Sequence, residues 1–473
     1  MTRQVAKQIS FADAGMRMQG VTLDPILQRV SDFLDRHADL VDRVYADLVR
    51  GLKRPRTGRD GISAAQVLRT FVLARIKDWD LRELRERIAD GYTLRVFTQF
   101  FAATVPNYRT INRNFNRLRP ETVRWVNEAV IDAVLKMRVG DVRQLREDTT
   151  VVATDVHFPT DSGLLWDVVR VETRLVSVLR QELGASLRCD FSDRTRRARR
   201  RAQEISRMTG KAHRTRQHAH KYRDLLRAAE EVLQQAAAHT HAARGLLKEL
   251  DPMRAALISG LISQIDEYAR LGRRVVDQTR RRVFGGEQLP VAEKLFSIFE
   301  PHTDLIVRGK ARTPVEFGHK VHLVECRGGL ITDYAVLEGT PPDQEHVLPT
   351  LRYHERRFGA PPAMLATDRG FHSAANIAAC KEAGVIDCIP QCGGQKTPER
   401  QAYEKNRAFK KGQRFRAGIE GRISVLLRGR GMKRCLSHGP ERFEVFVGMA
   451  VLANNLLVLA ALLAKNTPHR VAA

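Results

Sequence analysis

The apolar positions in the first third of the chain recur at helical spacing. Between residues 20 and 140, apolar side chains return every three or four positions, which is typical of amphipathic helices. Ser63 stands just before one such segment, where its hydroxyl can cap the helix. Gly91 follows another segment, at a position where glycine commonly ends a helix. The pattern predicts a helical N-terminal domain over residues 1–140.

A basic face distinguishes the helix expected after Pro106. In NYRTINRNFNRLRP, apolar side chains form one stripe, and arginines recur every four residues on another face, flanked by asparagines. A helix-turn-helix places such a helix in the major groove of DNA, whereas a solvated basic face is the plainer interpretation. The residues that we expect to contact DNA here are Arg109, Asn112, Arg113, Asn116 and Arg117.

The pattern changes from residue 142 onward. Residues 142–158 are rich in β-branched side chains and predict a strand. Residues 166–300 then return to a helical and very basic pattern. Between Arg194 and Arg223 there are twelve Lys or Arg and one acid, Glu204. A coiled-coil-like arm with a solvated surface fits this run, but its charge favours contact with nucleic-acid phosphates. The arginines that we expect to bind DNA there are Arg196, Arg197, Arg200 and Arg201.

Short strand patterns return near residue 304. Two β-like runs flank Gly328-Gly329 and predict a hairpin. Residues 362–368 predict another strand, and Ser373 can cap a helix that precedes a further strand over residues 385–390. After residue 414 the pattern is helical to the end. The order of these elements predicts a mixed α/β fold, with a sheet assembled from distant segments.

One segment has the length and apolarity of a membrane span. Residues 445–464 are twenty positions without a charge, and about twenty apolar residues cross a bilayer. Asn454 and Asn455 stand at its centre, and the remainder of the chain is strongly polar. We therefore expect a helix buried against the sheet, and no membrane partner.

The charge balance adds a partner to this picture. Eighty Lys and Arg against fifty-four Asp and Glu give a net charge of +26, a surplus typical of proteins that bind a polyanion. DNA or RNA is the first candidate, and an anionic membrane surface competes with it. Residues 1–11 contain no apolar stretch that indicates secretion. The six cysteines lack zinc-like spacing, and Cys388 and Cys392 have no second pair, which suits a reducing cytoplasm.

Three acids could carry phosphodiester chemistry. Such chemistry by two metal ions needs hard oxygen ligands that converge from several elements. Asp148 lies in the first predicted strand, Asp368 at the end of a later one, and Glu420 on the helix after residue 414. Spacing alone does not select these acids from fifty-four.

Each of these acids has an alternative interpretation. Asp155 competes with Asp148, and because the two lie seven residues apart they fall on opposite faces of one strand. Asp368 could be a capping acid, and Glu420 could pair with Arg416 four residues earlier. Asp161 falls in a predicted turn after Pro159. Asp343 and His346 fit a loop better than the site.

The chain resembles the DDE transposases of bacterial insertion sequences, closest to the ISNCY type. The resemblance covers about residues 50–465 and is carried by LREDTTVVATDVHFPTDSGLLWD (145–167), IVRGKARTPVEFGHKVHLV (306–324), LATDRGFHSAANI (365–377) and FRAGIEGRISVLLRGRGMKRC (415–435). It assigns Asp148, Asp368 and Glu420 as the catalytic acids and metal ligands. Arg416, which we expect to contact DNA, matches the Arg of a Tyr-Arg-Glu signature in related transposases, and Gln413 stands where that Tyr would be.

The resemblance also implies an architecture and a reaction. It implies an RNase H-like catalytic core, which we assign to residues 141–170 and 303–473, with residues 1–140 as a DNA-binding and dimerisation domain and residues 171–302 as a basic helical insertion. It implies two Mg²⁺ or Mn²⁺ ions, binding of terminal inverted repeats on double-stranded DNA, cleavage, and joining of a 3′-hydroxyl to target DNA. Synapsis of two ends predicts at least a homodimer, in the bacterial cytoplasm at the nucleoid.

Two other functions remain open. An RNase H-like nuclease would share the three acids but would not join strands. A non-catalytic basic nucleic-acid-binding protein would explain the charge without any chemistry. Strand joining distinguishes the three, because a nuclease yields only cut ends and a binding protein yields neither product.

Overall fold

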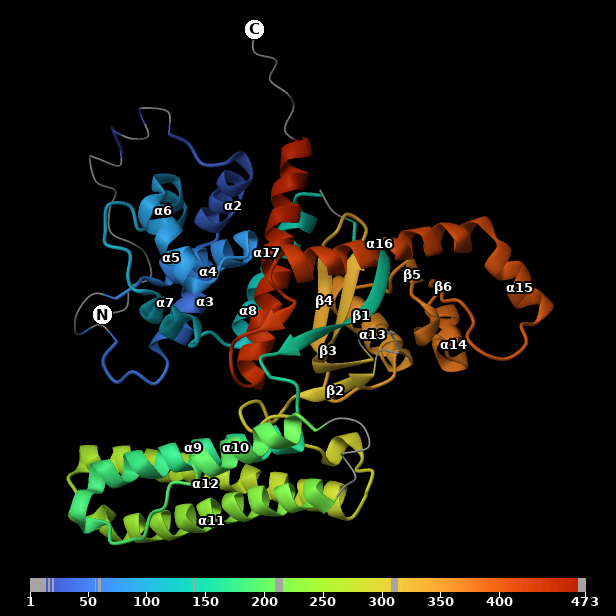
Figure 1. Ribbon diagram of the computed structural model, residues 1–473. Coiled ribbons are helices and arrows are strands. Elements are labelled where there is room, and N and C mark those ends of the chain that lie inside the picture. The colour runs from blue at the N-terminus through green and yellow to red at the C-terminus, as the bar shows by residue number, and fades with distance from the viewer. Residues whose placement is uncertain are drawn as a thin grey trace. The chain divides into compact units, whose positions relative to one another are not determined.

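The computed structural model describes residues 14–15, 18, 21–55, 57, 61–138, 141–208, 216–307 and 314–466 (Figure 1). The chain forms two compact units: Met1–Ala153 with His319–Ala473, and Thr154–Gly318. The domain boundaries expected from sequence, at residues 140, 170 and 302, stay a prediction. Residues 209–215 of the basic run and residues 308–313 of a resembling stretch lie outside the described residues.

The first unit begins with a group of short helices, as the apolar spacing predicts. Their bounds are α2 (Pro25–Arg36), α3 (Ala38–Val49), α4 (Ala64–Lys77), α5 (Leu81–Asp90), α6 (Tyr92–Thr98), α7 (Tyr108–Phe115) and α8 (Pro120–Lys136). Ser63 caps α4, because its Oγ accepts a hydrogen bond from the Gln66 N–H at 3.2 Å. The Gln66 side chain accepts one from the Ser63 N–H in return, which completes a capping box.

A mixed sheet forms the second half of this unit. Strand β1 (Gln144–Thr154) lies between β3 (Val315–Cys326) and β5 (Met364–Ala366), and β6 (Ile386–Cys388) follows β5. The β1–β5 and β5–β6 pairs are parallel. Strand β3 forms an antiparallel hairpin with β4 (Ile331–Val336), and the short β7 (Arg434–Cys435) pairs with β1. The predicted hairpin and mixed α/β class are therefore confirmed.

Glycines close the hairpin between β3 and β4. Gly328 and Gly329 have φ angles of 107° and 95°, a backbone region that side chains with a Cβ rarely adopt. The sequence-based prediction of a turn at these two residues is thus confirmed, for the reason on which it was based.

Helices from the C-terminal half accompany the sheet. They are α13 (Val347–Phe358), α14 (Ala374–Glu382), α15 (Pro398–Lys405), α16 (Arg407–Gly429) and α17 (Pro440–Asn466), with 3-10 turns η6 (Asp343–Glu345) and η7 (Arg369–Phe371). Ser373 caps α14 as predicted, with its Oγ accepting from the Asn376 N–H at 3.1 Å. The helical region starts at Pro398, earlier than the residue 414 expected from sequence, and β7 interrupts it.

The long apolar segment is buried inside the first unit. It lies in α17, which packs against α8, α4 and α2 on one side and contacts β4 on another (Figure 1). This is the one helix among the described residues that is long and apolar enough to span a membrane, and 78% of its apolar window is buried. The Asn455 Oδ1 accepts from the Ile331 N–H at 2.9 Å, and its Nδ2 donates to the Asn127 Oδ1 at 2.9 Å. The predicted buried helix is confirmed, and these hydrogen bonds explain its central amides.

The second unit is mainly helical. Its α-helices are α9 (Asp161–Leu183), α10 (Thr195–Ser206), α11 (Arg216–Leu246) and α12 (Pro252–Thr279), and they pack on one another through apolar faces. Short turns η1 (Gly184–Ser186), η3 (Leu247–Glu249), η4 (Arg280–Phe284) and η5 (Val291–Glu293) join or extend them, and β2 (Asp304–Val307) pairs with the first residues of β3.

The prediction of a turn at Asp161 is wrong. Thr160 is the cap and Asp161 the first residue of α9, because the Thr160 Oγ1 accepts from the Gly163 N–H at 3.0 Å. Asp161 is instead held by Arg282, with contacts of 2.9 and 3.0 Å.

Candidate active site

The register of two parallel strands brings Asp148 and Asp368 together. Arg146 on β1 is the partner of Ala366 on β5, so the residues two positions further on lie at the same level. Those residues are Asp148, still within β1, and Asp368, just past the end of β5. Neighbouring strands lie about 4.8 Å apart. Two acids that are 220 residues apart in sequence therefore meet at one edge of the sheet.

The third acid comes from α16, through an arginine. The Arg416 Nη2 lies 3.4 Å from the Asp148 Oδ2 and 3.7 Å from the Asp368 Oδ2. The Arg416 Nη1 donates to the Glu420 Oε1 at 3.1 Å. The structure thus brings the three sequence-predicted acids around one guanidinium group.

These acids also make the local contacts expected from the alternative interpretations. Asp368 does cap a turn, because its Oδ1 accepts from the Gly370 N–H at 2.8 Å while its Oδ2 faces Arg416. Glu420 does pair with Arg416 four residues earlier, and 68% of its side chain is exposed. The exposed fractions of Asp148 and Asp368 are 15% and 38%. The capping contact of Asp368 and the Glu420–Arg416 pair are therefore compatible with the convergence of the three acids on Arg416.

Close packing of α16 against the sheet makes this convergence possible. A Cβ on Gly412 would lie 2.1 Å from the Cys388 Sγ on β6, so glycine lets the helix approach the strand. The Arg146 Nη1 donates to the Phe415 carbonyl at 2.6 Å, which ties α16 to β1. The Gln413 Nε2 donates to the carbonyl oxygens of Thr367, at 3.1 Å, and Cys388. Arg416 lies one turn further along this anchored helix.

Asp343 is a fourth acid at this edge, which the sequence-based interpretation placed in a loop. It starts η6, and its Oδ1 accepts from the Thr149 hydroxyl at 2.9 Å and contacts the Lys320 Nζ at 2.6 Å. A Cβ on Gly370 would lie 3.0 Å from the Asp343 Oδ2 and 3.1 Å from the Asp368 Oδ1. The only sequence signal was the acid itself in PPDQEH, since no spacing relates residue 343 to residue 148.

The opposite face of β1 is anchored in the core. Glu147, next to Asp148, is fully buried, and its Oε2 accepts from the Thr350 hydroxyl at 2.6 Å and contacts the His322 Nε2 at 3.1 Å. Because successive side chains of a strand point to opposite faces, these contacts fix the direction in which Asp148 points. Asp155 lies one residue past the end of β1 and is exposed.

Burial makes the Asp148 carboxylate unfavourable without a cation. It raises the pKa of Asp148 to about 6, and the neighbouring Asp368 and Asp343 add to this effect. The Thr149 N–H, which donates to the Asp148 Oδ1 at 2.7 Å, and Arg416 lower the pKa and oppose it. Carboxylates that crowd together repel one another unless positive charge neutralises them. Arg416 supplies that charge in this structure.

The donor set fits a divalent cation in type and in charge. Carboxylate oxygens are the ligands that Mg²⁺ and Mn²⁺ prefer, and four acids meet here with one Arg and one Lys. Among the described residues, no three His, Cys, Asp or Glu side chains are already spaced to hold one metal ion. Arg416 occupies the centre of the acids, so a metal would share or replace its contacts.

The structure divides the basic face of α7. Arg109, Asn112 and Arg113 are exposed, whereas Asn116 is half-buried. Arg117 is also half-buried and donates to the Arg50 carbonyl at 2.5 Å, so it serves to join two helical segments.

The basic run of the second unit is divided in the same way. Arg196 and Arg200 are exposed on α10. Arg197 and Arg201 both pair with Asp224 on α11, and the contact of the Arg201 Nε is 2.6 Å. These contacts lower the pKa of Asp224 to about 2, with Arg197 the largest influence. Two of the four arginines predicted to bind DNA thus join helices to each other.

Comparison with known proteins identifies the N-terminal helices. Residues 21–117, which include α2 to α7, match the family model described as Transposase domain (DUF772). No curated protein matches the chain, and no solved structure matches it. Residues 21–117 are therefore similar to a transposase domain.

Proposed function

We propose that the chain is a DDE-type transposase that binds the terminal inverted repeats of its element, cleaves the ends and joins the freed 3′-hydroxyl to target DNA. The observation that carries this proposal is the convergence of Asp148, Asp368 and Glu420 on Arg416. The three acids belong to a strand, a strand end and a helix, as phosphodiester chemistry on converging carboxylates requires. The transposase domain at residues 21–117 supports the same conclusion independently.

The sheet supports an RNase H-like core for this enzyme. In such a core, an antiparallel hairpin lies on one side of a central first strand and parallel strands lie on the other. Here β1 lies between β3, which forms a hairpin with β4, and the parallel pair β5 and β6.

Asp148, Asp368 and Glu420 would hold two Mg²⁺ or Mn²⁺ ions, with Asp343 beside them. When bound, such ions supply activation of a water or 3′-hydroxyl nucleophile and stabilisation of the leaving oxygen. The chain's own residues would position the acids that hold these ions. Arg416 holds the three acids around one guanidinium group, and its buried Nε–H has no acceptor among the described residues.

A strand-transfer assay on DNA that carries the flanking element ends tests the proposal. Asp148→Asn, Asp368→Asn and Glu420→Gln should each abolish cleavage and joining while DNA binding persists. Glu382→Gln, which changes an exposed acid on α14, is the matched control and should keep full activity. Cut ends without joined product would favour a nuclease, and normal cleavage by Asp148→Asn would show that the site is assigned wrongly.

A further inference from the structure

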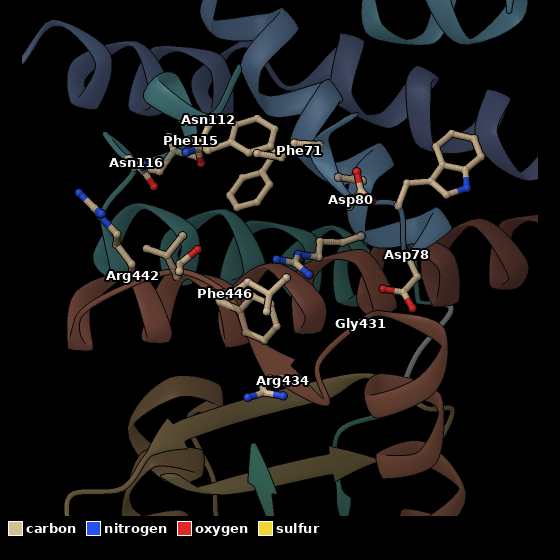
Figure 2. Close-up of a pocket in the computed structure, with 18 residues that line it drawn as sticks. Phe71, Asp78, Asp80, Asn112, Phe115, Asn116, Gly431, Arg434, Arg442 and Phe446 are labelled. Atoms are coloured by element: carbon tan, nitrogen blue, oxygen red, sulfur yellow. The ribbon is translucent and has the colours of Figure 1, made fainter. Parts of the chain in front are cut away.

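A cavity of about 440 Å³ lies within the first unit, between the transposase domain and the C-terminal segment. Its lining comes from α4, α5 and α7 on one side and from residues 431–446 on the other (Figure 2). The catalytic acids are not among the lining residues. Cavities of about 300–1,000 Å³ are the size that small organic ligands occupy.

The walls of this cavity are aromatic. Phe71 and Phe115 stack with their ring centroids 4.1 Å apart and form one wall. Figure 2 shows Phe446 of α17 facing them from the other side. Flat aromatic surfaces of this kind stack on any nucleobase, because every base has a π face.

Arg75 is a half-buried cation in this cavity, and it forms no salt bridge among the described residues. Its guanidinium lies over the Phe446 ring, 4.2 Å from the centroid. The Arg75 Nε–H is buried and has no acceptor among the described residues, and no carboxylate there lies within ion-pair distance of Arg75. Burial lowers the pKa of Arg75 to about 10, and Cys435 and then Asp78 oppose this only in part. A buried N–H donor without an acceptor is unfavourable, so the Arg75 guanidinium points to an anion that binds here.

The remaining polar groups are placed around the opening. Asn112 of α7, Asn116 just after it and Arg442 of α17 lie at one end of the cavity, and Asp78 lies near Gly431 at the other end (Figure 2). Amide and carboxylate groups pair with the donors and acceptors on base edges, and arginines hold phosphates. The cavity therefore combines an aromatic slot, edge-reading groups and an unpaired cation.

We propose that this cavity binds a single unstacked nucleotide, with the base against Phe71 and Phe115 and the phosphate on Arg75. The source to which we commit is an unpaired nucleotide of bound DNA. A free mononucleotide has the same chemistry and is the alternative source. This inference rests on DNA binding by the transposase domain, and it does not depend on the catalytic acids.

The test uses the full-length protein without divalent metal and two probes. One probe is a duplex with a single unpaired 2-aminopurine nucleotide, compared with the same duplex fully paired. The other is deoxyadenosine monophosphate, compared with deoxyadenosine. We expect the unpaired nucleotide to raise affinity, and Arg75→Met to remove about ten- to a hundredfold of that gain, as expected when a hydrogen bond to a charged group is removed. Affinity for the paired duplex should not change.

Stability distinguishes a ligand-binding arginine from a structural one. Arg75→Met removes a half-buried charge that has no salt bridge among the described residues, and it keeps an apolar contact on Phe446, so its melting temperature should equal or exceed that of the wild type. Arg82→Gln is the matched control, because Arg82 is exposed over the Tyr108 ring at 5.1 Å and does not line the cavity.

Three outcomes decide the inference. Equal affinity of the wild type for both duplexes, together with no binding of the mononucleotide, would overturn it. A lower melting temperature of Arg75→Met with unchanged nucleotide affinity would make Arg75 structural and also overturn it. Binding of the mononucleotide alone would support the cavity chemistry and overturn DNA as its source. The Asp148→Asn variant should bind both probes normally, so failure here is separable from failure of the catalytic proposal.

Discussion

Glu172 in the second unit should make the stability of its helical bundle depend on pH. The side chain lies on α9, is fully buried, and neither carboxylate oxygen has a hydrogen-bond partner among the described residues. Burial raises the pKa of Glu172 to about 8, and Asp266 adds to this effect while Arg273 opposes it. The folded bundle therefore holds a neutral acid at neutral pH.

The sign and size of the effect follow from proton linkage. Between pH 4.5, the ordinary pKa, and about 8, the folded state keeps a proton that the unfolded state has released. The free energy of unfolding therefore falls as pH rises, by up to about 1.4 kcal/mol per pH unit. From pH 5.5 to 7.5 the decrease is about 2–3 kcal/mol. Below pH 4.5 both states are protonated and the effect vanishes.

Hydrogen exchange of peptides from α9 and α12 measures this decrease in the intact chain. Glu172→Gln cannot ionise, so its protection relative to the wild type should grow steadily between pH 5.5 and 7.5. Comparing the two proteins at each pH cancels the intrinsic exchange rate. Asp224→Asn is the control, because the low pKa of Asp224 keeps this acid charged throughout the pH window. The loss of protection that this variant causes should therefore be the same at each pH.

A gap between wild type and Glu172→Gln that does not change with pH would refute this reasoning. It would mean that Glu172 is ionised in the folded bundle and paired with a cation, for which Arg273 is the candidate because its charge lowers the pKa of Glu172. A difference from the wild type that grows with pH in both Glu172→Gln and Asp224→Asn would point to another titrating group in the bundle.

Three further changes test the packing and the two basic surfaces. Gly412→Ala should push α16 away from Cys388, reduce strand transfer and destabilise the protein by about 1–3 kcal/mol through overpacking. Gly421→Ala, with open space at its Cβ, should instead stabilise α16. Equal melting temperatures of the two variants would contradict this prediction. The double variant Arg196→Gln/Arg200→Gln should weaken DNA binding, and the log–log slope of the binding constant against salt should fall by about 0.9 for each phosphate that is no longer neutralised. The double variant Arg197→Gln/Arg201→Gln should mainly reduce stability. The reverse pattern would show that the two pairs of arginines are misassigned. Arg416→Gln should increase the rise in melting temperature that Mn²⁺ produces, because Mn²⁺ no longer competes with a guanidinium for the acids. An equal rise in the wild type and in Arg416→Gln would argue against a site that Mn²⁺ and Arg416 share.

Local signals in the sequence were sufficient for most of the elements. Ser63 and Ser373 cap helices where their positions predict it, and Gly328 and Gly329 make the hairpin turn. These features depend on hydrogen bonds and φ angles within a few residues, which a sequence displays directly. The turn expected at Asp161 failed because the Thr160 cap competed with the proline-based turn signal.

The candidate site depends on long-range geometry that the sequence does not display. Asp148 and Asp368 meet because Arg146 pairs with Ala366, and a shift of one residue in that register would turn one acid to the other face. Asp343 joins them only because η6 lies beside Thr149. Resemblance to a family supplied the identity of three acids, but neither the fourth acid nor the central position of Arg416 followed from it.

The net charge of +26 overstates the surface available to DNA. Several of the arginines behind it hold the fold together: Arg124 contacts Asp333, Arg146 contacts Glu325, and Arg197 and Arg201 share Asp224. Counting charges cannot separate these arginines from the exposed Arg196 and Arg200, because the sequence shows each of them only as an arginine. What separates them is the presence of a carboxylate within reach. By that criterion Arg75, which is half-buried and forms no salt bridge among the described residues, has a stronger claim to bind an anion than the arginines that hold the fold together do.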